Sequence, residues 1–440
     1  MTNRFKVLNC CKSSENCLMN VLRVMVLSIV IILDGLLSPV LSQVFRTQIF
    51  SSSIKTLQIG RYGDKYASNM ISLTENEKLV VRFDEMSHNS HAYSYKVIHC
   101  NADWTESAIS SNEYLQGFLS LDISDYTRSN STTVLYTHYK FELPNDQMKF
   151  KISGNYVALI YEDNKTEKPV AQVCFTVYEP KVTIEHTLRC NTDIELNGRF
   201  QQLDFDIKLQ GVNVQIPQDE LKVVVRQNNR FDNEVFGVQP TYINGSVFSF
   251  KNNRSLIFEG GNEYHSVDLS SVYVATRGVD RIRFEKPNYV AYLRPQKATK
   301  PMAYEHEFDA NGKFVVNSQE AVGDVNTDAD YLLVHFSVDS PEPFLDGRVY
   351  VGGDFNYNLL NDKSMMNYDF QLKRYLFSTL LKQGGYNYQY WFLRKSEFKS
   401  SVEKMEGSFW QTTNEYSIYV YYRPIGALYD RLVGIKVIGN

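Results

Sequence analysis

The chain has 440 residues, of which 43% are hydrophobic and 22% charged, so it can bury sizeable cores and is not an intrinsically disordered polymer. Lysine and arginine number 46 against 50 aspartates and glutamates, a formal net charge of −4. Nucleic-acid-binding proteins usually carry a basic face and a high pI, so this balance argues against that class. The 30 tyrosines and 26 phenylalanines favour β-strands over a helical bundle or a doubly wound nucleotide fold.

Residues 1–42 have the pattern of a signal peptide. Arg23 precedes an apolar run at 24–33, and Ser42 supplies a small residue before a cleavage site at Gln43. The apolar run is shorter than the roughly 20 residues that a spanning helix needs, which favours cleavage over the alternative, a signal anchor. The sequence therefore predicts an exported protein.

The mature chain is expected to be unlipidated and mildly acidic. No cysteine follows the apolar run where a bacterial lipoprotein needs one. Removing the segment takes away four basic and two acidic residues, which leaves 42 basic and 48 acidic residues and a net charge of −6. The segment before the apolar run is unusually long, so both Met1 and Met19 are candidates for the first residue.

Three cysteines remain after cleavage: Cys100, Cys174 and Cys190. They allow one disulfide at most, so the protein is not a disulfide scaffold. Whether any two of them pair is open. Cys100 ends an alternating segment, where we expect a buried, unreactive thiol.

Period-2 alternation recurs along the whole mature chain, and helical periodicity is hard to find. Short strands separated by Gly, Asn, Asp and Pro are typical of β-sandwiches, so we predict an all-β protein. Segments 148–152 and 156–161 are expected to form a hairpin. The other expected strands are 79–83, 93–100, 139–143, 170–178, 203–209, 221–226, 281–284, 289–293, 331–338, 348–352, 375–381, 386–392 and 416–422.

Two breaks divide these strands into three groups of a size that suits one sandwich each. The first break is at Pro180, and the second lies between Pro295 and Asp330, where alternation is lost. We therefore predict three tandem immunoglobulin-like β-sandwiches. Their expected ranges are 43–180, 181–300 and 331–440, with a linker at 301–330.

Motifs of catalysis are missing from the sequence. There is no G-x-S-x-G elbow, HExxH helix, P-loop or G-x-G-x-x-G turn. His88 and His91 are close in sequence to His99, but no cysteine or carboxylate joins them at zinc spacing. A carboxylate pair of a glycoside hydrolase is not excluded, because its separation depends on the fold. We expect no catalytic, cofactor-binding or metal-binding residues.

One polar segment resembles a calcium loop, with oxygen-bearing side chains at alternate positions. They are Asp324, Asn326, Asp328 and Asp330. The glycine that such a loop needs at its sixth position is Ala329, and Phe336 occupies the place of the bidentate glutamate. A polar turn leading into a strand at Tyr331 is the favoured interpretation, and calcium stays open.

The last block resembles the early-set immunoglobulin-like module of glycogen-binding and starch-enzyme accessory domains. The likeness rests on residues 349–356 and 384–392. Such modules hold sugar on tryptophans, but Asn358 stands where one of these is usual. Gln389 and Tyr390 stand near the place of the family's lysine. Both departures weaken a carbohydrate-binding interpretation.

Taken together, fragments from every block resemble one family, the type IX secretion system plug proteins of the Bacteroidota. Their order and spacing carry the likeness, which covers essentially the whole mature chain. The fragments are 52–58, 93–104, 113–118, 136–139, 143–145, 153–156, 161–163, 223–228, 230–233, 260–263, 329–331, 352–356, 421–424 and 429–432.

The resemblance implies a non-enzymatic periplasmic protein, associated with the inner face of the outer membrane, that closes the periplasmic side of a very large outer-membrane β-barrel translocon. It implies no cofactor, no nucleic acid and no membrane span. A carbohydrate-binding protein is the alternative, and a secreted glycoside hydrolase is a third candidate. The fragment from His99 to Trp104 is expected to be core rather than contact surface.

Overall fold

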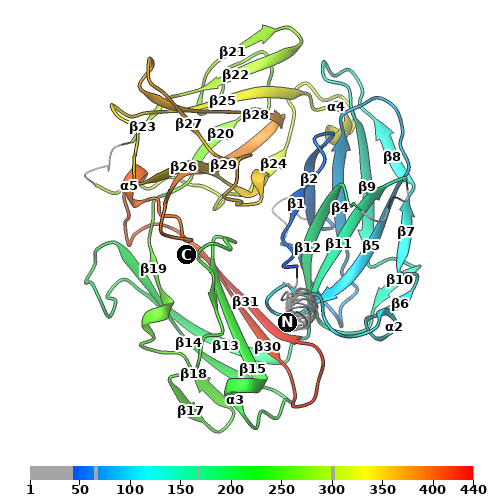
Figure 1. The fold of residues 1–440 in the computed structure, drawn as a ribbon, viewed down its shortest axis with the longest axis vertical. Helices are drawn as coiled ribbons and strands as arrows, with labels where there is room; N and C mark the ends of the chain where they lie inside the picture. The colour runs from blue at the N-terminus through cyan, green and yellow to red at the C-terminus, as the bar shows by residue number, and fades with distance from the viewer. Residues whose placement is uncertain (1–42, 64–67, 164, 166–167, 299–302, 440) are drawn as a thin grey trace, which may run out of the picture. The chain divides into compact units, whose positions relative to one another are not determined.

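The computed structural model describes residues 43–63, 68–163, 165, 168–298 and 303–439 (Figure 1). Strands hold 48% and helices 6% of the structure, which confirms the all-β prediction. The number of immunoglobulin-like sandwiches stays a prediction. The signal peptide predicted for residues 1–42 lies outside the described residues. Within the described ranges, no helix has both the length and the apolar character to cross a membrane.

The first core lies between two sheets from the N-terminal part of the chain. Their elements are β1 (Gln48–Ile49), β2 (Ile54–Arg61), β3 (Met70–Ser72), β4 (Leu79–Glu85), β5 (Tyr93–Cys100), α2 (Ser111–Tyr114), β6 (Leu115–Gly117), β7 (Ser120–Ile123), β8 (Asp125–Arg128), β9 (Thr137–Leu143), β10 (Met148–Phe150), β11 (Gly154–Glu162) and β12 (Ala171–Tyr178). One sheet has the order β1-β12-β11-β5-β7 and the other β2-β4-β9-β8. Alternate residues of β4, namely Leu79, Val81 and Phe83, are fully buried in this core, as period-2 geometry requires.

The predicted hairpin between 148–152 and 156–161 is wrong. β10 pairs with β6, and β11 lies between β12 and β5. Gly154 has a positive φ of 152°, and a Cβ there would lie 2.2 Å from the His99 Nε2 atom. The glycine therefore gives the chain room to pass the His99 ring at the start of β11 and does not form a tight turn.

The second core combines segments from the middle and the end of the chain. Its elements are β13 (Val182–Arg189), β14 (Phe200–Leu209), α3 (Pro217–Glu220), β15 (Leu221–Gln227), β16 (Val235–Phe236), β17 (Tyr242–Asn244), β18 (Val247–Ser249), η1 (Arg254–Leu256), β19 (Ile257–Glu259), β30 (Glu415–Tyr422) and β31 (Arg431–Gly439). One sheet has the order β13-β14-β18-β17 and the other β16-β15-β30-β31. Val223 and Val225 pack there against Ile418 and Val420.

The third core is formed by the segments in between. Its elements are β20 (His265–Asp268), β21 (Val279–Glu285), β22 (Asn288–Leu293), β23 (Gln296–Lys297), β24 (Phe314–Val316), α4 (Val325–Asp328), β25 (Tyr331–Asp339), β26 (Gly347–Gly352), η2 (Asp354–Asn356), β27 (Asn367–Asp369), β28 (Arg374–Lys382), β29 (Gly384–Arg394) and α5 (Glu403–Glu406). The sheets have the orders β21-β22-β25-β28-β27 and β20-β29-β24, with β26 also paired to β29.

This strand pairing crosses the predicted boundaries at 181–300 and 331–440. β30 and β31 belong to the sheet of β15, although they come from the predicted third block. β20, β21 and β22 join the third core, and β24 of the predicted 301–330 linker pairs with β29. Alternation identifies a strand but carries no information on a partner almost 200 residues away. We propose that the chain be divided by core, with the second unit assembled from two separate segments.

Candidate functional site

A buried polar cluster joins the first core to the third, and we call it the Asp84 cluster. Asp84 of β4 accepts hydrogen bonds at 2.6 Å from Lys382 Nζ and from the Tyr331 hydroxyl. His138 Nδ1 of β9 lies 2.6 Å from the other Asp84 oxygen. The Tyr136 ring lies 4.2 Å below the Lys382 ammonium, and the side chains of Asp84 and Lys382 are each only 1% exposed. The charges therefore compensate each other away from water.

The pKa of the Asp84 carboxyl follows from this geometry. Burial alone would raise it, because a low-dielectric interior disfavours the charged form. Lys382 and His138 outweigh that effect and hold the pKa below its ordinary value. Asp84 is therefore a carboxylate at neutral pH, and its charge holds together strands from two cores.

A second cluster, the Arg226 cluster, joins the first core to the second. The Arg226 guanidinium is paired with Glu234 and lies 3.9 Å from the Phe231 ring centroid. It also faces the ring of Trp104, from the first block, at 5.8 Å and that of Tyr419 at 5.1 Å. Burial would lower the pKa of Arg226, but Glu234 and the neighbouring tyrosines outweigh it and raise the pKa. The cation is held by one carboxylate and three aromatic faces.

A third contact joins the second core to the third. Arg230 donates to Asp232 at 2.7 Å and to Ser400 Oγ at 2.9 Å, and its guanidinium lies 4.3 Å from the Trp391 ring centroid. Burial raises the pKa of Asp232, but Arg230 and Ser400 outweigh it and the pKa is lowered. This ion pair is therefore kept charged although both side chains are buried.

Two carboxylates fix the C-terminal segment against the first core. Asp430 accepts from the Ala102 amide at 3.0 Å and from Lys222 Nζ at 3.1 Å. The Glu179 carboxylate accepts a hydrogen bond from the Arg431 guanidinium at 2.8 Å. Burial acts to raise the Glu179 pKa, but its hydrogen bonds, with Arg431 first, lower it to about 2. Fragments that carry the family resemblance thus lie at the junctions between cores.

Four residues of the fragment from His99 to Trp104 are buried, as predicted, whereas Asn101 is partly buried and Asp103 is exposed. His99 is fully buried, with Nδ1 2.8 Å from Ser107 Oγ, and burial lowers its pKa to about 4. Trp104 is 1% exposed. His88 and His91 do not join it in a ligand set: His88 contacts the Ser129 carbonyl, and His91 lies 3.2 Å from Glu162.

No group of three or more His, Cys, Asp or Glu residues suited to a metal is present among the described residues. The oxygen-bearing side chains of the calcium-like segment serve the local fold instead. Asp324 caps α4 by accepting from the Asn326 amide at 2.9 Å, and Asp330 accepts from the amides of Thr133 and Val134 at 2.7 and 3.0 Å. The expected turn leading into a strand at Tyr331 is confirmed.

Cys100, Cys174 and Cys190 are free thiols. Cys100 and Cys174 are buried in the same apolar cluster, against Val157 and Trp104. Burial raises the pKa of the Cys174 thiol to about 12 and that of Cys100 well above its ordinary value. Both are therefore protonated and unreactive at neutral pH, as expected for Cys100.

The residues that would mark a sugar platform are not at the surface. Trp391 is fully buried, with its indole N–H 3.1 Å from Gln389, and Asn358 is 7% exposed. Stacking of a sugar requires an accessible aromatic face, and neither position supplies one. The geometry therefore disfavours the carbohydrate-binding alternative.

We expect the mature chain, residues 43–440, to bind malto-oligosaccharides no more tightly than about 100 μM, the affinity of a weak complex worth roughly 5–6 kcal/mol. Isothermal calorimetry measures this directly. The whole mature chain is required, because a fragment starting at 325 would leave β30 and β31 without β15. A dissociation constant clearly below that value would contradict the prediction and revive the sugar-binding interpretation.

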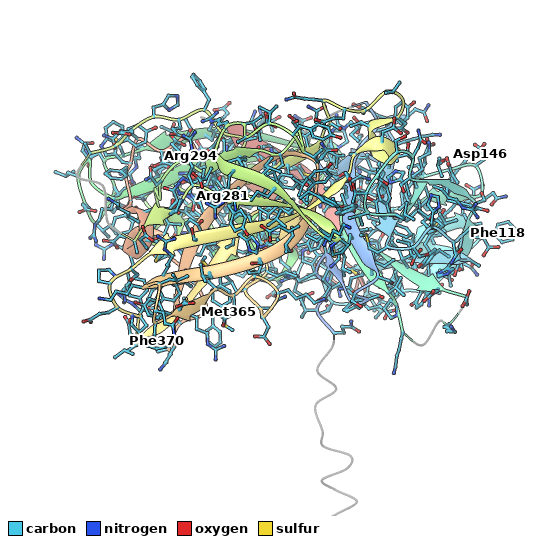
Figure 2. The ribbon with its side chains drawn as sticks, turned by 90° about the horizontal axis from the view of Figure 1, so that it is seen from above. Phe118, Asp146, Arg281, Arg294, Met365 and Phe370 are labelled. Atoms are coloured by element: carbon cyan, nitrogen blue, oxygen red, sulfur yellow. The ribbon has the colours of Figure 1, made fainter. Side chains whose placement is uncertain are left out.

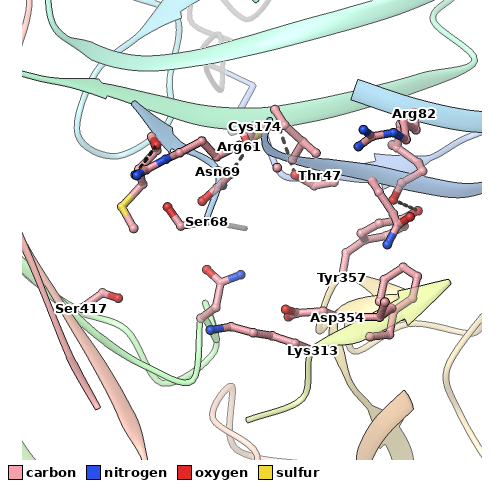
Figure 3. Close-up of a pocket in the computed structure, with 18 of the residues that line it drawn as sticks. Thr47, Arg61, Ser68, Asn69, Arg82, Cys174, Lys313, Asp354, Tyr357 and Ser417 are labelled. Atoms are coloured by element: carbon pink, nitrogen blue, oxygen red, sulfur yellow. Dashed lines mark hydrogen bonds between the residues drawn. The ribbon is translucent and has the colours of Figure 1, made fainter. Parts of the chain in front are cut away.

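A cavity of about 460 Å³ lies where the three cores approach one another, and we call it the cationic cavity (Figure 3). Its basic side chains are Arg46, Arg61, Arg82 and Lys313, and its acidic ones are Asp354 and Glu415. Figure 3 shows Arg61, Asn69 and Arg82 on one side and Lys313 and Asp354 on the other. Sequence analysis missed this cavity, although Arg82 inside an apolar strand was a visible signal.

Large apolar side chains are exposed at both edges of the six-stranded sheet of the third core, in which β23 also pairs with β25. At the β21 edge, Phe284 packs at 5.1 Å against Tyr289, which also contacts Tyr273. Tyr273 is 73% exposed. At the β27 edge, Phe370 is 76% exposed and points away from the body (Figure 2), and Leu372 is exposed nearby. Clusters of this kind commonly mark interaction surfaces.

Comparisons with known proteins agree with the sequence resemblance. Residues 54–179 match the family described as "Type 9 secretion system plug protein 1st domain". The chain is also similar to the crystal structure of a hypothetical protein from Parabacteroides merdae ATCC 43184, with 39% sequence identity and a TM-score of 0.88. That alignment covers 90% of this chain and 100% of the other. No curated protein matches the chain.

The matched family is one of structural plug domains and is not a known enzyme family. It supports a role in secretion, implies association with the type IX translocon, and points to a periplasmic or outer-membrane-associated location. An all-β body whose cores are joined by buried polar and cation–aromatic contacts and which exposes aromatic edges is consistent with such a role. The chain belongs to the family of type IX secretion system plug proteins.

Proposed function

We propose that the protein is a non-enzymatic plug that binds the type IX outer-membrane translocon and seals its periplasmic side. The observation that supports this most is family membership, together with the Asp84, Arg226 and Arg230 contacts that tie the three cores to one another. A seal must keep its shape against a wide opening. Separating the cores would leave Asp84 and Lys382 without their counter-charges, and it would take Trp104 from Arg226 and Trp391 from Arg230.

The contact with the barrel is proposed to be mainly apolar. The mature net charge of −6 gives little long-range attraction, whereas the exposed groups around Phe284 and Phe370 supply aromatic area at low entropic cost. We therefore assign the barrel contact to one of these two edges of the third core.

We expect pull-down of the tagged protein from solubilised outer membranes to retain the translocon barrel in about 0.5 M salt, where exposed ion pairs are screened within a few ångströms. We compare two double variants, one at each edge: Phe370→Asp/Leu372→Asp and Tyr273→Asp/Phe284→Asp. We expect one of them to abolish retention of the barrel, and the other then serves as its control. Mass spectrometry identifies the retained proteins. Loss of the barrel at high salt in the unmodified protein would contradict an apolar contact.

Deleting the protein should make the outer membrane more permeable to large polar molecules without removing any single enzyme activity. Uptake of a large hydrophilic antibiotic measures this. Unchanged permeability, together with no barrel in the pull-down, would leave the sealing role without support.

A further inference from the structure

Two open strand edges border the cationic cavity. β2 ends its sheet and pairs only with β4 among the described strands, and Leu57 to Arg61 of β2 line the cavity. β24 is likewise the last strand of its sheet, paired with β29, and all three of its residues, Phe314 to Val316, line the cavity. Open edges carry unsatisfied backbone groups and accept an added strand.

The register shows which β2 backbone groups face the open edge. The Tyr62 amide, just after β2, donates to the carbonyl of Lys78, just before β4, at 3.0 Å. The backbone groups of Tyr62 therefore point toward β4 and away from the open edge. Alternate residues of an antiparallel strand present their amides to opposite sides. The backbone groups of Ile59 and Arg61 therefore point to the open edge, toward the cavity.

The charges of the cavity favour an anionic occupant. Among the described residues, the Arg82 side chain makes no hydrogen bond or ion pair, and the Arg46 side chain donates to the Phe45 carbonyl and lies 4.1 Å from the Phe231 ring centroid. Burial lowers the pKa of both guanidiniums, which is the cost of holding a cation with too few partners. Lys313 is already paired with Glu415 at 2.7 Å. The cavity thus holds two guanidiniums that form no ion pair with any described carboxylate.

Asp354 also lines the cavity, on the side of Lys313, and it forms no ion pair with Arg46 or Arg82. Asp354 is partly buried and accepts a hydrogen bond from Asn358 at 2.9 Å. Burial raises the pKa of Asp354 to about 7, against the lowering effect of Lys313, so this group is only partly ionised at neutral pH. Arg46 and Arg82 therefore feel carboxylates only at longer range, Glu234 and Asp103 for Arg46 and Asp324 and Glu142 for Arg82.

Apolar and aromatic side chains also line the cavity, among uncharged polar ones such as Gln58, Asn69 and Asn229; they are Leu57, Met70, Phe231, Phe314, Tyr357 and Tyr419. A volume of about 460 Å³ is in the range of ligand sites. A free inorganic anion would use the guanidiniums but neither the strand edges nor the apolar lining. An extended peptide with alternating acidic and apolar side chains uses all three.

We propose that the cationic cavity binds an extended, acidic segment of a partner polypeptide, which adds as a strand to the open edge of β2 with its carboxylates against Arg82 and Arg46. The backbone groups of Ile59 and Arg61 pair with the added strand. This inference does not depend on the sealing role, because it concerns a site within the purified chain.

The test uses a fluorescein-labelled octapeptide of alternating valine and glutamate with residues 43–440, followed by fluorescence anisotropy. We expect saturable binding with a dissociation constant of tens of micromolar, a modest affinity for such a contact. The same peptide with lysine for glutamate should bind at least about tenfold more weakly. N-methylation of alternate peptide amides should also weaken binding at least about tenfold, because it removes the backbone hydrogen bonds between the peptide and β2.

Arg82→Gln should also reduce affinity about tenfold, the loss of one charge-assisted contact. Arg128→Gln, on exposed β8 of the same core, is the matched control and should leave affinity unchanged. Should Arg82→Gln fail to fold by circular dichroism, the N-methylated peptide tests the same site in the unmodified protein. No binding at 1 mM peptide, indifference to N-methylation, or equal binding by citrate alone would overturn the proposal.

Discussion

Replacing Asp84 by asparagine is expected to lower the free energy of unfolding by about 3–5 kcal/mol, because it leaves the Lys382 ammonium buried without a carboxylate. The side-chain amide of the new asparagine can still hydrogen-bond with Tyr331 and His138. The fall in unfolding free energy therefore measures the loss of the charge alone. Lys382→Met should lower the free energy of unfolding by a similar amount, because it leaves the Asp84 carboxylate buried without its cation. Equilibrium unfolding in urea, followed by circular dichroism, measures both.

The double variant Asp84→Asn/Lys382→Met removes both charges and should lose clearly less than the sum of the two single losses. The matched control is Asp125→Asn, since Asp125 is exposed and lies 3.4 Å from Lys140 in the same core. It should change stability by less than about 1 kcal/mol. Additive single losses, or a loss below about 1 kcal/mol for Asp84→Asn, would contradict the role of this cluster.

The stabilisation from Asp84 should depend on pH with a defined sign. Its folded pKa is depressed below the unfolded value of about 4, so the unfolded chain takes up the proton first as pH falls. The contribution is complete above that pH and is lost as pH falls through the folded pKa. The stability difference between the unmodified protein and Asp84→Asn should therefore be larger at pH 7 than at pH 3.

Local sequence pattern was sufficient to predict many of the strands, although β2, β13 and β31 were not among them. The segment Tyr93–Cys100 forms a strand with the predicted bounds, because its alternating residues fill two cores at once: Tyr95 and Val97 face one, and Ile98 and Cys100 the other. A period of two is a property of the strand itself and needs no knowledge of its partner.

Strand partners and junctions could not be predicted in this way. β15 pairs with β30, and Asp84 meets Lys382 across 298 residues, so neither relation is present in any local window. The sequence does contain a partial signal. A charged residue inside an apolar strand, such as Asp84 or Arg226, requires either an oppositely charged partner or access to a cavity. The sequence pattern does not distinguish these two outcomes.

The cationic cavity shows the same limit. Arg82 and Asp84 are two residues apart in β4 and have opposite outcomes: Asp84 is enclosed by Lys382 and His138, whereas Arg82 faces the cavity. Only the arrangement of the three cores distinguishes a structural charge from one that is available to a ligand.

Replacing Arg226 by methionine is expected to cost about 3 kcal/mol or more in unfolding free energy. The change leaves Glu234 in a mostly buried position without its partner and removes the cation from the faces of Trp104, Phe231 and Tyr419. Trp104 belongs to the first block and Tyr419 to the second core. Loss of the Arg226 contacts should therefore loosen the packing at the junction between them.

The emission of Trp104, whose ring is 1% exposed in the intact structure, reports on that junction once Trp391 and Trp410 are replaced by phenylalanine in all proteins compared. In Arg226→Met we expect a red-shifted emission and easier quenching by acrylamide before global unfolding begins. Glu234→Leu added to Arg226→Met should recover part of the stability, since no buried charge then remains. Arg283→Met, on the exposed face of β21, is the control and should alter neither emission nor stability. An unshifted emission together with a loss below about 1 kcal/mol in Arg226→Met would mean that the two cores are held together by their apolar contacts alone.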